Sequence, residues 1–221
     1  MFLPAHRPEN AAGRNGEVRQ IIHIAVCRFR CLGRQTVRRE RKHGTRCRRQ
    51  EVRYSGRREG RETGSVSQKK AGKYLISQYQ KNGISFPKGA TDFYQKIPAA
   101  FLNAKRNENL PDSENIWAYI EGSEKPNEIL VISAHYDHVG MKNGEIFNGA
   151  DDDGSGTVAL LEIAQAFEKA KKEGKGPKRS ILFLHVTGEE HGLHRSRYYS
   201  ENPLFPLANT ITNLNIDMIG R

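Results

Sequence analysis

The residue types best suited to chemistry follow an apolar segment near the middle of the chain. Apolar residues 129–132 lead into His135 and Asp137, and three consecutive aspartates, Asp151–Asp153, come shortly afterwards, before Gly-Ser-Gly and a long run of apolar residues at helical spacing. A strand that ends in His-x-Asp, followed by carboxylates at the start of a helix, is how an α/β protein builds a metal site at the carboxyl edge of its sheet. Because adjacent carboxylates repel one another, this pattern predicts a bound cation.

Simpler interpretations of these first groups compete with a metal site. A lone histidine at a strand end is commonly a hydrogen-bonded core residue, but Asp137 lies two positions after His135 and can orient its second ring nitrogen. Asp151–Asp153 could cap the helix that is expected to begin near Ser155, since carboxylates are favoured at a helix N-terminus. One aspartate would be enough for that cap, so three of them favour a cation.

Two further carboxylate groups follow later apolar runs. Glu189 and Glu190 come after the apolar run 180–186, and alone they could be a solvated pair in a loop. Asp217 lies near the end of the run 210–220, where a carboxylate among apolar neighbours needs a partner. Right-handed crossovers between parallel strands bring the carboxyl ends of those strands to one edge. Three strands therefore deliver metal-type ligands to a single edge of the predicted sheet.

The elements that must position these residues alternate between strand and helix. Apolar periodicity predicts an amphipathic helix that ends at Gly83 and a second helix from Ser155 to about Lys172. Strands are expected at 115–122, 128–135, 180–186 and 210–220, with an edge strand or two in the segment 84–104 and a short helix at 192–201. A turn-rich sequence between the first two of these strands favours a hairpin. The fold class is α/β: a doubly wound, mostly parallel mixed sheet with flanking helices.

A calcium-binding loop is an alternative for the aspartate cluster. From Asp151 onward the chain has the order Asp-x-Asp-x-Ser-Gly, and Glu162 stands at position twelve. This matches the loop of a helix–loop–helix calcium hand. That motif needs a helix before the loop, whereas a strand and two glycines come before it here.

Four segments together resemble a known family, the co-catalytic di-zinc aminopeptidases. The segments are SAHYDHVG, NGADDDGSGT, GEE-x-GL and NLNIDMIGR, in this order along the chain. The family includes secreted bacterial aminopeptidases, aminopeptidase Y and plasma glutamate carboxypeptidase. The resemblance covers about 60–221 and implies the phosphorylase/hydrolase-like fold of the zinc exopeptidases.

The resemblance implies a role for each position. One zinc would be held by His135 and Asp217, and the other by Glu190. Asp152 would bridge both zinc ions, Asp137 would orient His135, and Glu189 would be the general base. The complete site would hold two Zn²⁺ and would hydrolyse a peptide at its free N-terminus through a metal-bridging water. A cis peptide bond is also expected between Asp152 and Asp153.

The chain departs from the family pattern at two places. His191 and His194 follow the third motif, and we expect both to be surface residues. The family supplies its last zinc ligand, a histidine, from a loop beyond the fourth motif, and the sequence stops at Arg221. We therefore expect 60–221 to be the N-terminal portion of the catalytic domain, with weak or no peptidase activity of its own and a tendency to aggregate.

Residues 1–59 differ from the remainder in charge. The chain has a net charge of +11, and its first 61 residues contain 16 Arg and one Lys against five Glu. A basic arm for nucleic acid or an acidic membrane is one interpretation, and a Cys/His metal knuckle is a second. The third, which the loss of apolar periodicity favours, is a spurious segment out of frame with the real protein. We predict a disordered or spurious segment and no nucleic-acid partner.

The sequence also bears on membrane insertion and on non-catalytic roles. No stretch of the sequence reaches the ~18 apolar residues of a membrane span, so no transmembrane segment is predicted. The resemblance implies an extracytoplasmic or secreted protein, whereas its oligomeric state is left open. A non-catalytic relative that keeps the fold as an interaction domain is the main alternative to an enzyme, and the presence of Glu189 and Asp152 argues against it.

Overall fold

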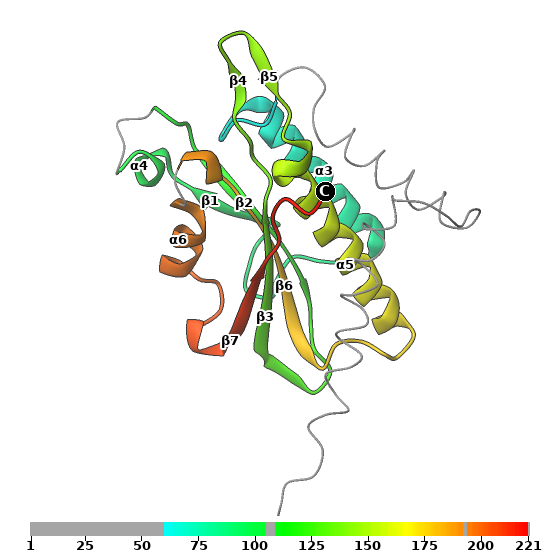
Figure 1. Ribbon diagram of the computed structural model, residues 1–221. Coiled ribbons are helices and arrows are strands. Elements are labelled where there is room, and N and C mark those ends of the chain that lie inside the picture. Colours follow the sequence, from blue (N-terminus) through cyan, green and yellow to red (C-terminus); the bar gives the residue numbers. More distant parts are fainter. Residues whose placement is uncertain (1–59, 105–108, 192–193, 221) are drawn as a thin grey trace, which may run out of the picture.

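The computed structural model describes residues 60–104, 109–191 and 194–220. These residues form a five-stranded sheet in the order β1-β2-β6-β3-β7 and a separate two-stranded hairpin (Figure 1). The sheet strands are β1 (Tyr94–Ile97), β2 (Ser113–Ile120), β3 (Lys125–His135), β6 (Arg179–Val186) and β7 (Thr210–Asn215). The hairpin strands are β4 (Gly140–Lys142) and β5 (Glu145–Phe147). The interpretations of residues 1–59 lie outside the described residues and stay predictions.

The sheet is mixed, and its parallel part contains the three strands that were expected to carry the site. β3 pairs in parallel with β6 on one side and with β7 on the other, whereas β2 pairs antiparallel with β6 and β1 antiparallel with β2. The predicted hairpin of β2 and β3 is wrong. The two strands are consecutive in sequence, but β6 lies between them and takes the hydrogen bonds of both.

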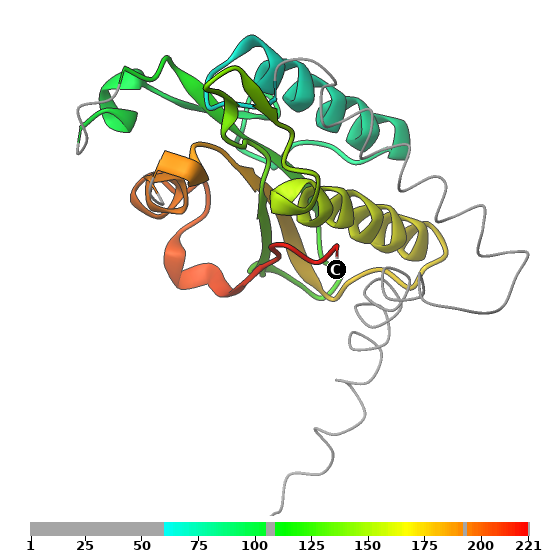
Figure 2. The same ribbon diagram turned by 45° about the horizontal axis from the view of Figure 1, so that its top comes forward.

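Two long helices cover one face of the sheet. They are α3 (Val66–Asn82) and α5 (Gly156–Lys172), which run side by side in both ribbon views (Figures 1 and 2). The side chain of Ser65 accepts a hydrogen bond from the backbone of Gln68 at the start of α3, and Gly83 closes the helix in the left-handed conformation. Both predicted helices are therefore confirmed. Their apolar sides and alternate sheet residues form the larger core cluster, which includes Leu75, Tyr79, Ile116, Ile132, Leu160, Phe167 and Phe183.

The opposite face of the sheet carries a smaller apolar cluster. Leu182 and Leu184 of β6 point to this face because successive strand residues alternate sides, and they pack with Val131, Trp117 and Tyr199. Tyr199 comes from the short helix α6 (His194–Glu201), which Figure 2 shows on the side away from α5. The remaining elements are the four-residue helix α4 (Ala99–Leu102) and the 3₁₀ turns η2 (Glu189–His191) and η3 (Leu207–Asn209). Helices on both faces match the predicted doubly wound arrangement.

The last strand differs from its prediction in length and burial. β7 ends at Asn215, two residues before Asp217, and most of its residues are exposed in the described structure. Asp217 therefore does not lie in a buried apolar strand end: its side chain is 44% exposed. Among the described residues, no helix combines the length and the apolar character that a membrane crossing requires.

Candidate metal centre

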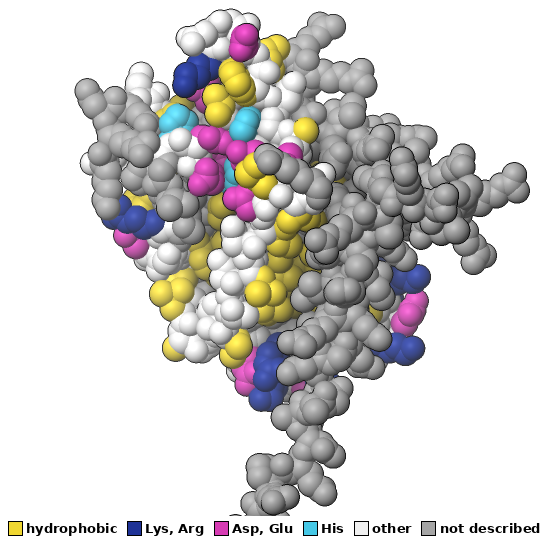
Figure 3. Space-filling model, in the orientation of Figure 1, with side chains coloured by type: hydrophobic (Ala, Val, Ile, Leu, Met, Phe, Trp, Pro, Cys, Tyr) yellow, Lys and Arg dark blue, Asp and Glu magenta, His cyan; other side chains and the backbone are white. Residues whose placement is uncertain are grey.

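The carboxyl ends of β6, β3 and β7 bring the predicted ligands together. These three strands are parallel neighbours, with His135 opposite Val186 and Ser133 opposite Asn215 in the register. The residues that follow each strand therefore leave the sheet at the same edge. In the space-filling view, acidic side chains and histidines gather at this edge, just below the β4–β5 hairpin (Figure 3).

Among the described residues, two groups of three side chains could each hold a metal ion. The first group is His135, Asp153 and Asp217, and the second is His138, Asp152 and Glu190. Within each group the potential ligand atoms lie within 4.8 Å of one another. Each predicted ligand thus belongs to one of the two groups: His135 and Asp217 to the first, and Asp152 and Glu190 to the second.

His135 is the most deeply fixed of these ligands. Its side chain is only 3% exposed, and its Nε2 atom lies 2.9 Å from Asp152 Oδ1 and 4.0 Å from Asp217 Oδ1. Its Nδ1 atom lies 3.0 Å from the backbone oxygen of Asp137 and 3.6 Å from the Asp137 carboxylate. Nδ1 is thus engaged by Asp137, which leaves Nε2 toward Asp152 and Asp217. The orienting role of Asp137 stays a prediction; its backbone oxygen lies nearer to Nδ1 than its carboxylate does.

The Asp137 carboxylate joins three segments behind the site. It is fully buried. Its Oδ2 atom accepts a hydrogen bond from the Thr63 hydroxyl at 2.7 Å, and its Oδ1 atom accepts one from the backbone N–H of Glu189 at 3.3 Å. Because the same carboxylate approaches His135, it links the end of β3 to the turn that carries Glu189 and Glu190.

The three consecutive aspartates have different tasks. Asp153 is fully buried and accepts hydrogen bonds from three backbone N–H groups, those of His135, Gly156 and Met218. Asp151 Oδ1 accepts from the backbone N–H of Gly220 at 2.7 Å. Asp152 instead reaches His135 and the second group of ligands. Asp153 therefore caps α5, because it accepts from the N–H of Gly156, the first residue of that helix. Asp152 instead contacts His135 of the first group and belongs to the second.

The turn η1 (Ala150–Ser155) that carries these aspartates is not a calcium loop. It follows β5 and not a helix, and Glu162 lies within α5. Backbone angles at Asp152 and Asp153 are non-helical, and the peptide bond between them is cis, as the resemblance implied. The calcium-hand alternative is thus wrong, because the preceding helix that it needs is a strand.

Two glycines allow this turn to approach its neighbours. Gly149 has a φ of +52°, and a Cβ atom there would lie 2.1 Å from the Asp152 backbone oxygen and 2.4 Å from the His138 ring. A Cβ atom at Gly156 would lie 2.3 Å from Asp153 Oδ1. Both distances are too short for any side chain, so glycine is required where the chain packs against Asp152, Asp153 and His138.

His138 is a member of the second group that the sequence analysis did not single out. Its Nδ1 atom lies 2.7 Å from Glu190 Oε1, and its side chain is 12% exposed. It stands within the first motif, one residue after Asp137, and that proximity was the signal that could have identified it. His191 belongs to neither group and is partly buried, whereas the side chain of His194 lies outside the described residues.

A buried arginine holds the loops around the second group. Arg61 is fully buried, and its guanidinium donates hydrogen bonds to the backbone oxygens of Tyr136, Asn148 and Gly149. The backbone oxygen of Arg61 in turn accepts from the N–H of His138 at 2.9 Å. One residue therefore fixes both the segment after β3 and the segment before the aspartates.

Burial and charge shift the pKa values of two site residues strongly. Burial alone would lower the pKa of His135, but Asp137 and the neighbouring aspartates outweigh it and raise this pKa to about 9. Burial raises the pKa of Asp153 to about 7, against the opposing effect of His135 and with a further rise from Asp217. The carboxylates around His135 thus favour a positive charge at this position.

The donor set at this edge fits zinc. Imidazole nitrogens and carboxylate oxygens are ordinary zinc ligands, and catalytic zinc sites keep a position open for water or substrate. The His138 Nδ1 and Glu190 Oε1 atoms are buried and have no hydrogen-bond partner among the described residues, although they are close together. Two unsatisfied ligand atoms that face each other are the arrangement that a cation between them would stabilise.

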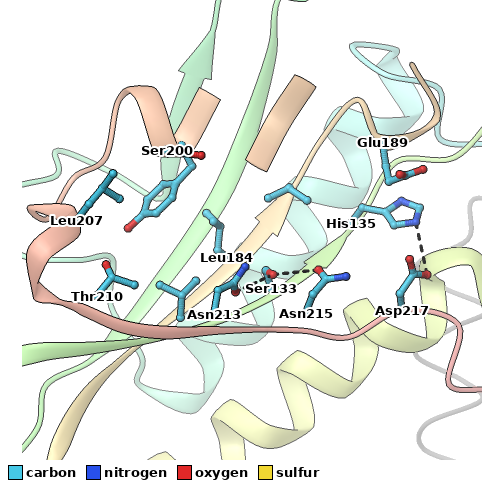
Figure 4. A pocket seen from close by; sticks show the side chains of 13 residues that line it. Ser133, His135, Leu184, Glu189, Ser200, Leu207, Thr210, Asn213, Asn215 and Asp217 are labelled. Atoms are coloured by element: carbon cyan, nitrogen blue, oxygen red, sulfur yellow. Dashed lines mark hydrogen bonds and ion pairs between the residues drawn. The ribbon is translucent and has the colours of Figure 1, made fainter. Parts of the chain in front are cut away.

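A cavity of about 400 Å³ opens beside the first group. Figure 4 shows Glu189, His135 and Asp217 together at one end of it, and Leu207, Ser200 and Thr210 toward the other. Ser133 donates to the side-chain oxygens of Asn213 and Asn215 along its floor. The cavity is thus polar at the metal end and along the β7 side, and apolar where Val131, Leu184 and Tyr199 line it.

Known proteins resemble the chain in sequence and in fold. The model of peptidase family M28 matches residues 115–221. A probable zinc metalloprotease from Pyrenophora teres f. teres is 36% identical over 116 residues, which are 48% of this chain and 22% of that protein. A vacuolar membrane protease from Tuber melanosporum is 34% identical over 106 residues, which are 47% of this chain and 10% of that protein. The chain therefore spans less than a quarter of the length of these two relatives.

Solved structures agree on the fold. A Zn-dependent exopeptidase from Parabacteroides distasonis superposes with a TM-score of 0.59 at 18% identity, over 78% of this chain and 60% of that one. The mixed sheet with flanking helices thus has the fold of that exopeptidase, and the described residues form a part of it. Residues 115–221, which match the model of peptidase family M28, carry all four motifs and both groups of ligands.

Proposed function

We propose that this chain carries the catalytic centre of a zinc-dependent aminopeptidase, which hydrolyses the N-terminal peptide bond of its substrate. The observation that carries the proposal is the convergence of two ligand groups at the carboxyl edge of three parallel strands, where Asp152 of the second group contacts His135 of the first. In α/β enzymes the binding and catalytic residues commonly lie at the carboxyl edge of the sheet. The family of the matched residues supports the same reaction class.

The proposed ligands divide between two zinc positions. His135 and Asp217 would hold one zinc, Glu190 the other, and Asp152 would bridge them. When bound, a zinc pair lowers the pKa of water to near neutrality and polarises the scissile carbonyl. The chain's own task is to hold these side chains in place, and Asp137 does so for His135 through the contacts at Nδ1.

Glu189 is the proposed general base. It lines the cavity beside His135 and Asp217, and it belongs to neither ligand group in the described part of the chain. Its backbone N–H is held by Asp137, so its position is tied to that of the first ligand. Its carboxylate would accept a proton from the attacking water and deliver that proton to the leaving amine.

The substrate is proposed to be a peptide with a free N-terminus. The carboxylate-rich edge suits a positively charged amine, and the adjoining cavity is large enough for a side chain. An extracytoplasmic location is part of the proposal, on the basis of the family resemblance. A purely structural, non-catalytic role is disfavoured because Glu189 and the four proposed ligands all lie at one edge.

An assay of the purified 221-residue chain with added zinc tests this function. We expect slow, zinc-dependent cleavage of an unblocked dipeptide amide, and little or no cleavage of the N-acetylated form. Glu189→Gln should reduce turnover by about 100-fold or more while zinc content stays unchanged. Equal cleavage of the blocked substrate would contradict an aminopeptidase, and full activity of Glu189→Gln would remove Glu189 from the mechanism. A zinc-loaded chain without any turnover would contradict catalysis by this chain.

A further inference from the structure

The turn that carries Glu189 is joined to its strand through a residue with little backbone preference of its own. β6 ends at Val186, and Thr187 and Gly188 come before Glu189. Gly188 has a φ of +67°, in a region that glycine enters as readily as the usual one. The local sequence therefore does not determine the direction in which Glu189 leaves the sheet, and contacts on the two sides of Gly188 must do so.

Both neighbours of Gly188 are held by buried side chains from other segments. After it, the backbone N–H of Glu189 donates to Asp137 Oδ1 at 3.3 Å. Before it, the backbone N–H of Thr187 donates to Asn115 Oδ1 at 3.0 Å. Thr187 is fully buried, so its hydroxyl must also find partners inside the protein.

The Thr187 hydroxyl belongs to a closed triad with Ser113 and Gln68. Gln68 Nε2 donates to Thr187 Oγ1, the Thr187 and Ser113 hydroxyls lie 2.9 Å apart, and Ser113 Oγ donates to Gln68 Oε1 at 2.9 Å. The three bonds fit one direction around the ring, because each group then donates to one partner and accepts from the other. Hydrogen bonds linked in this way strengthen one another in a buried environment. The triad thus holds the end of β6 against α3 and the start of β2.

Gln68 also holds the contact on the other side of Gly188. Its Oε1 atom accepts from the backbone N–H of Gly64, and the preceding residue, Thr63, donates to Asp137 Oδ2 at 2.7 Å. That aspartate is the acceptor for the backbone N–H at the start of the turn. One end of the Gln68 amide therefore leads to the end of β6, and the other leads through Thr63 and Asp137 to the same turn.

A simpler role for Gln68 would be to cap α3. It stands three residues after Ser65, whose hydroxyl accepts from the Gln68 backbone N–H, as in a capping box. In that motif the glutamine side chain returns to the backbone N–H of the capping residue, whereas the Ser65 N–H donates to the backbone oxygen of Glu62. The Gln68 side chain is instead fully buried and bonded to the Thr187 hydroxyl. Its interior contacts thus exceed what a helix cap requires.

We propose that Gln68 is a positioning residue for the general base Glu189. It acts through Thr187 on one side of Gly188, and through Thr63 and Asp137 on the other. The inference rests on the proposed function for the role of Glu189, whose side chain lies beside His135 at one end of the cavity (Figure 4). Loss of the triad should let the turn move about Gly188 while every proposed ligand stays in the chain.

The test compares buried polar groups at opposite ends of β6. Gln68→Met and Thr187→Val break the triad at the site end with side chains of similar size. Ser180→Ala is the matched control, because Ser180 is fully buried at the other end of the strand and its hydroxyl makes three hydrogen bonds there. All three variants lose buried hydrogen bonds, but only the first two release the turn. Denaturant unfolding of each variant reports whether it folds.

The first measurement is the zinc-dependent cleavage of the unblocked dipeptide amide. Gln68→Met and Thr187→Val should each lower kcat about 10-fold, with KM within about twofold of wild type. The double variant should lose about as much as either single variant, because both changes break the same triad. Thr187→Ser, which keeps the hydroxyl, and Ser180→Ala should both keep kcat within about twofold. Bound zinc at saturating zinc, measured by equilibrium dialysis and inductively coupled plasma mass spectrometry, should be the same in all variants.

Amide hydrogen exchange of the metal-free chain tests the positioning without catalysis. The Glu189 N–H should exchange at least about 10-fold faster in Gln68→Met than in wild type, and within about twofold of wild type in Ser180→Ala. Equal kcat in Gln68→Met and Ser180→Ala would overturn the inference, and so would equal exchange of the Glu189 N–H in these two variants. Absence of turnover in the zinc-loaded wild type would instead contradict the proposed function, and the exchange comparison would then decide the inference alone.

Discussion

The two ligand groups lie side by side but are positioned by different parts of the fold. The first group is centred on His135, the last residue of β3, whose backbone N–H and both ring nitrogens are all in contact with site residues. The second group is centred on His138 and Glu190, which belong to loops and a short turn. The sheet therefore fixes the first group, and tertiary contacts between loops fix the second.

This difference indicates which group depends on the regular fold and which on particular contacts. His135 is held at the end of β3, where it pairs with Val186 of β6. His138 depends on Arg61 and Gly149, which come from before α3 and from the segment after β5. We therefore expect single substitutions in those loops to weaken the second group before the first.

The largest effect is expected for Asp152, which belongs to the second group and contacts His135 of the first. Asp152→Asn keeps the size of the side chain but removes its charge, so both zinc positions lose their common ligand. We expect fewer than one bound zinc per chain and a loss of at least about 1,000-fold in any hydrolysis. Bound zinc is measured as before, by dialysis and mass spectrometry. Asp151→Asn is the matched control, since Asp151 caps Gly220 and can do so as an amide. Two retained equivalents in Asp152→Asn would mean that Asp152 does not bridge the two zinc positions.

The next largest effect, on the free energy of unfolding, is expected for the buried Arg61, which binds the loops around the second group. Arg61→Met removes charged hydrogen bonds to three backbone oxygens while it preserves apolar volume. We expect the free energy of unfolding to fall by about 3 kcal/mol, because the carbonyls stay buried without their donor. Denaturant unfolding of the metal-free chain measures it.

Arg61→Lys sharpens the comparison, because it keeps the charge but not the fork of donors. An intermediate loss of stability is expected, with the second zinc equivalent weakened more than the first. A change below about 0.5 kcal/mol in Arg61→Met would show that the arginine does not hold these loops.

The substitution Gly149→Ala has a smaller expected effect on stability, but it separates the second group from the first most directly. Gly149→Ala places a Cβ atom against the Asp152 backbone and the His138 ring, and alanine is also strained at this φ. We expect about 2 kcal/mol of destabilisation and weaker binding of the second zinc equivalent.

Gly144→Ala is the control, with a φ of +81° but open space around its Cβ position. It shares the backbone strain without the contact, so it should cost about 1 kcal/mol and leave both zinc equivalents in place. Equal zinc binding in the two variants would remove Gly149 from the positioning of His138.

The sequence predicted two of the three members of each group, and it missed Asp153 in the first and His138 in the second. Buried strands such as β6 have continuous apolar runs, and parallel strands bring their carboxyl ends to one edge, so the positions of His135 and Glu190 follow from local pattern and general topology. The direction of the His138 side chain follows from neither. It depends on Arg61, which lies 77 positions earlier in the chain and whose contact with the loop is a matter of tertiary packing.

The errors in the fold have a similar origin. β2 and β3 are joined by a short turn-rich segment, and such segments commonly form hairpins, but β6 pairs with both strands and separates them. Nothing between residues 113 and 135 encodes that insertion. The predicted burial of Asp217 failed because strand periodicity does not reveal whether a strand has a covered face, and β7 has little cover among the described residues.

The smallest predicted effect comes from a third histidine, which lies in β6 beside the site but not in it. His185 is opposite Ala134 in the register and is fully buried, with its Nε2 atom 2.7 Å from the Tyr79 hydroxyl. Burial lowers the pKa of His185 to about 3, whereas the carboxylates raise that of His135 to about 9. Two buried histidines on neighbouring strands thus differ in charge because of what surrounds them.

Because its pKa is lowered in the folded chain, His185 makes the free energy of unfolding depend on pH. Below a pH of about 6.5 the unfolded chain binds a proton at His185 that the folded chain excludes, so stability falls as the pH decreases toward about 3 and is unaffected above about 7. Between about pH 7.5 and 5.5 the loss should be about 1.4 kcal/mol. His185→Gln, which can still accept from Tyr79, should remove that part of the slope in denaturant unfolding of the metal-free protein at the two pH values. Because every other titrating group is present in both proteins, parallel pH dependences for wild type and His185→Gln would mean that His185 takes up its proton equally well in the folded chain.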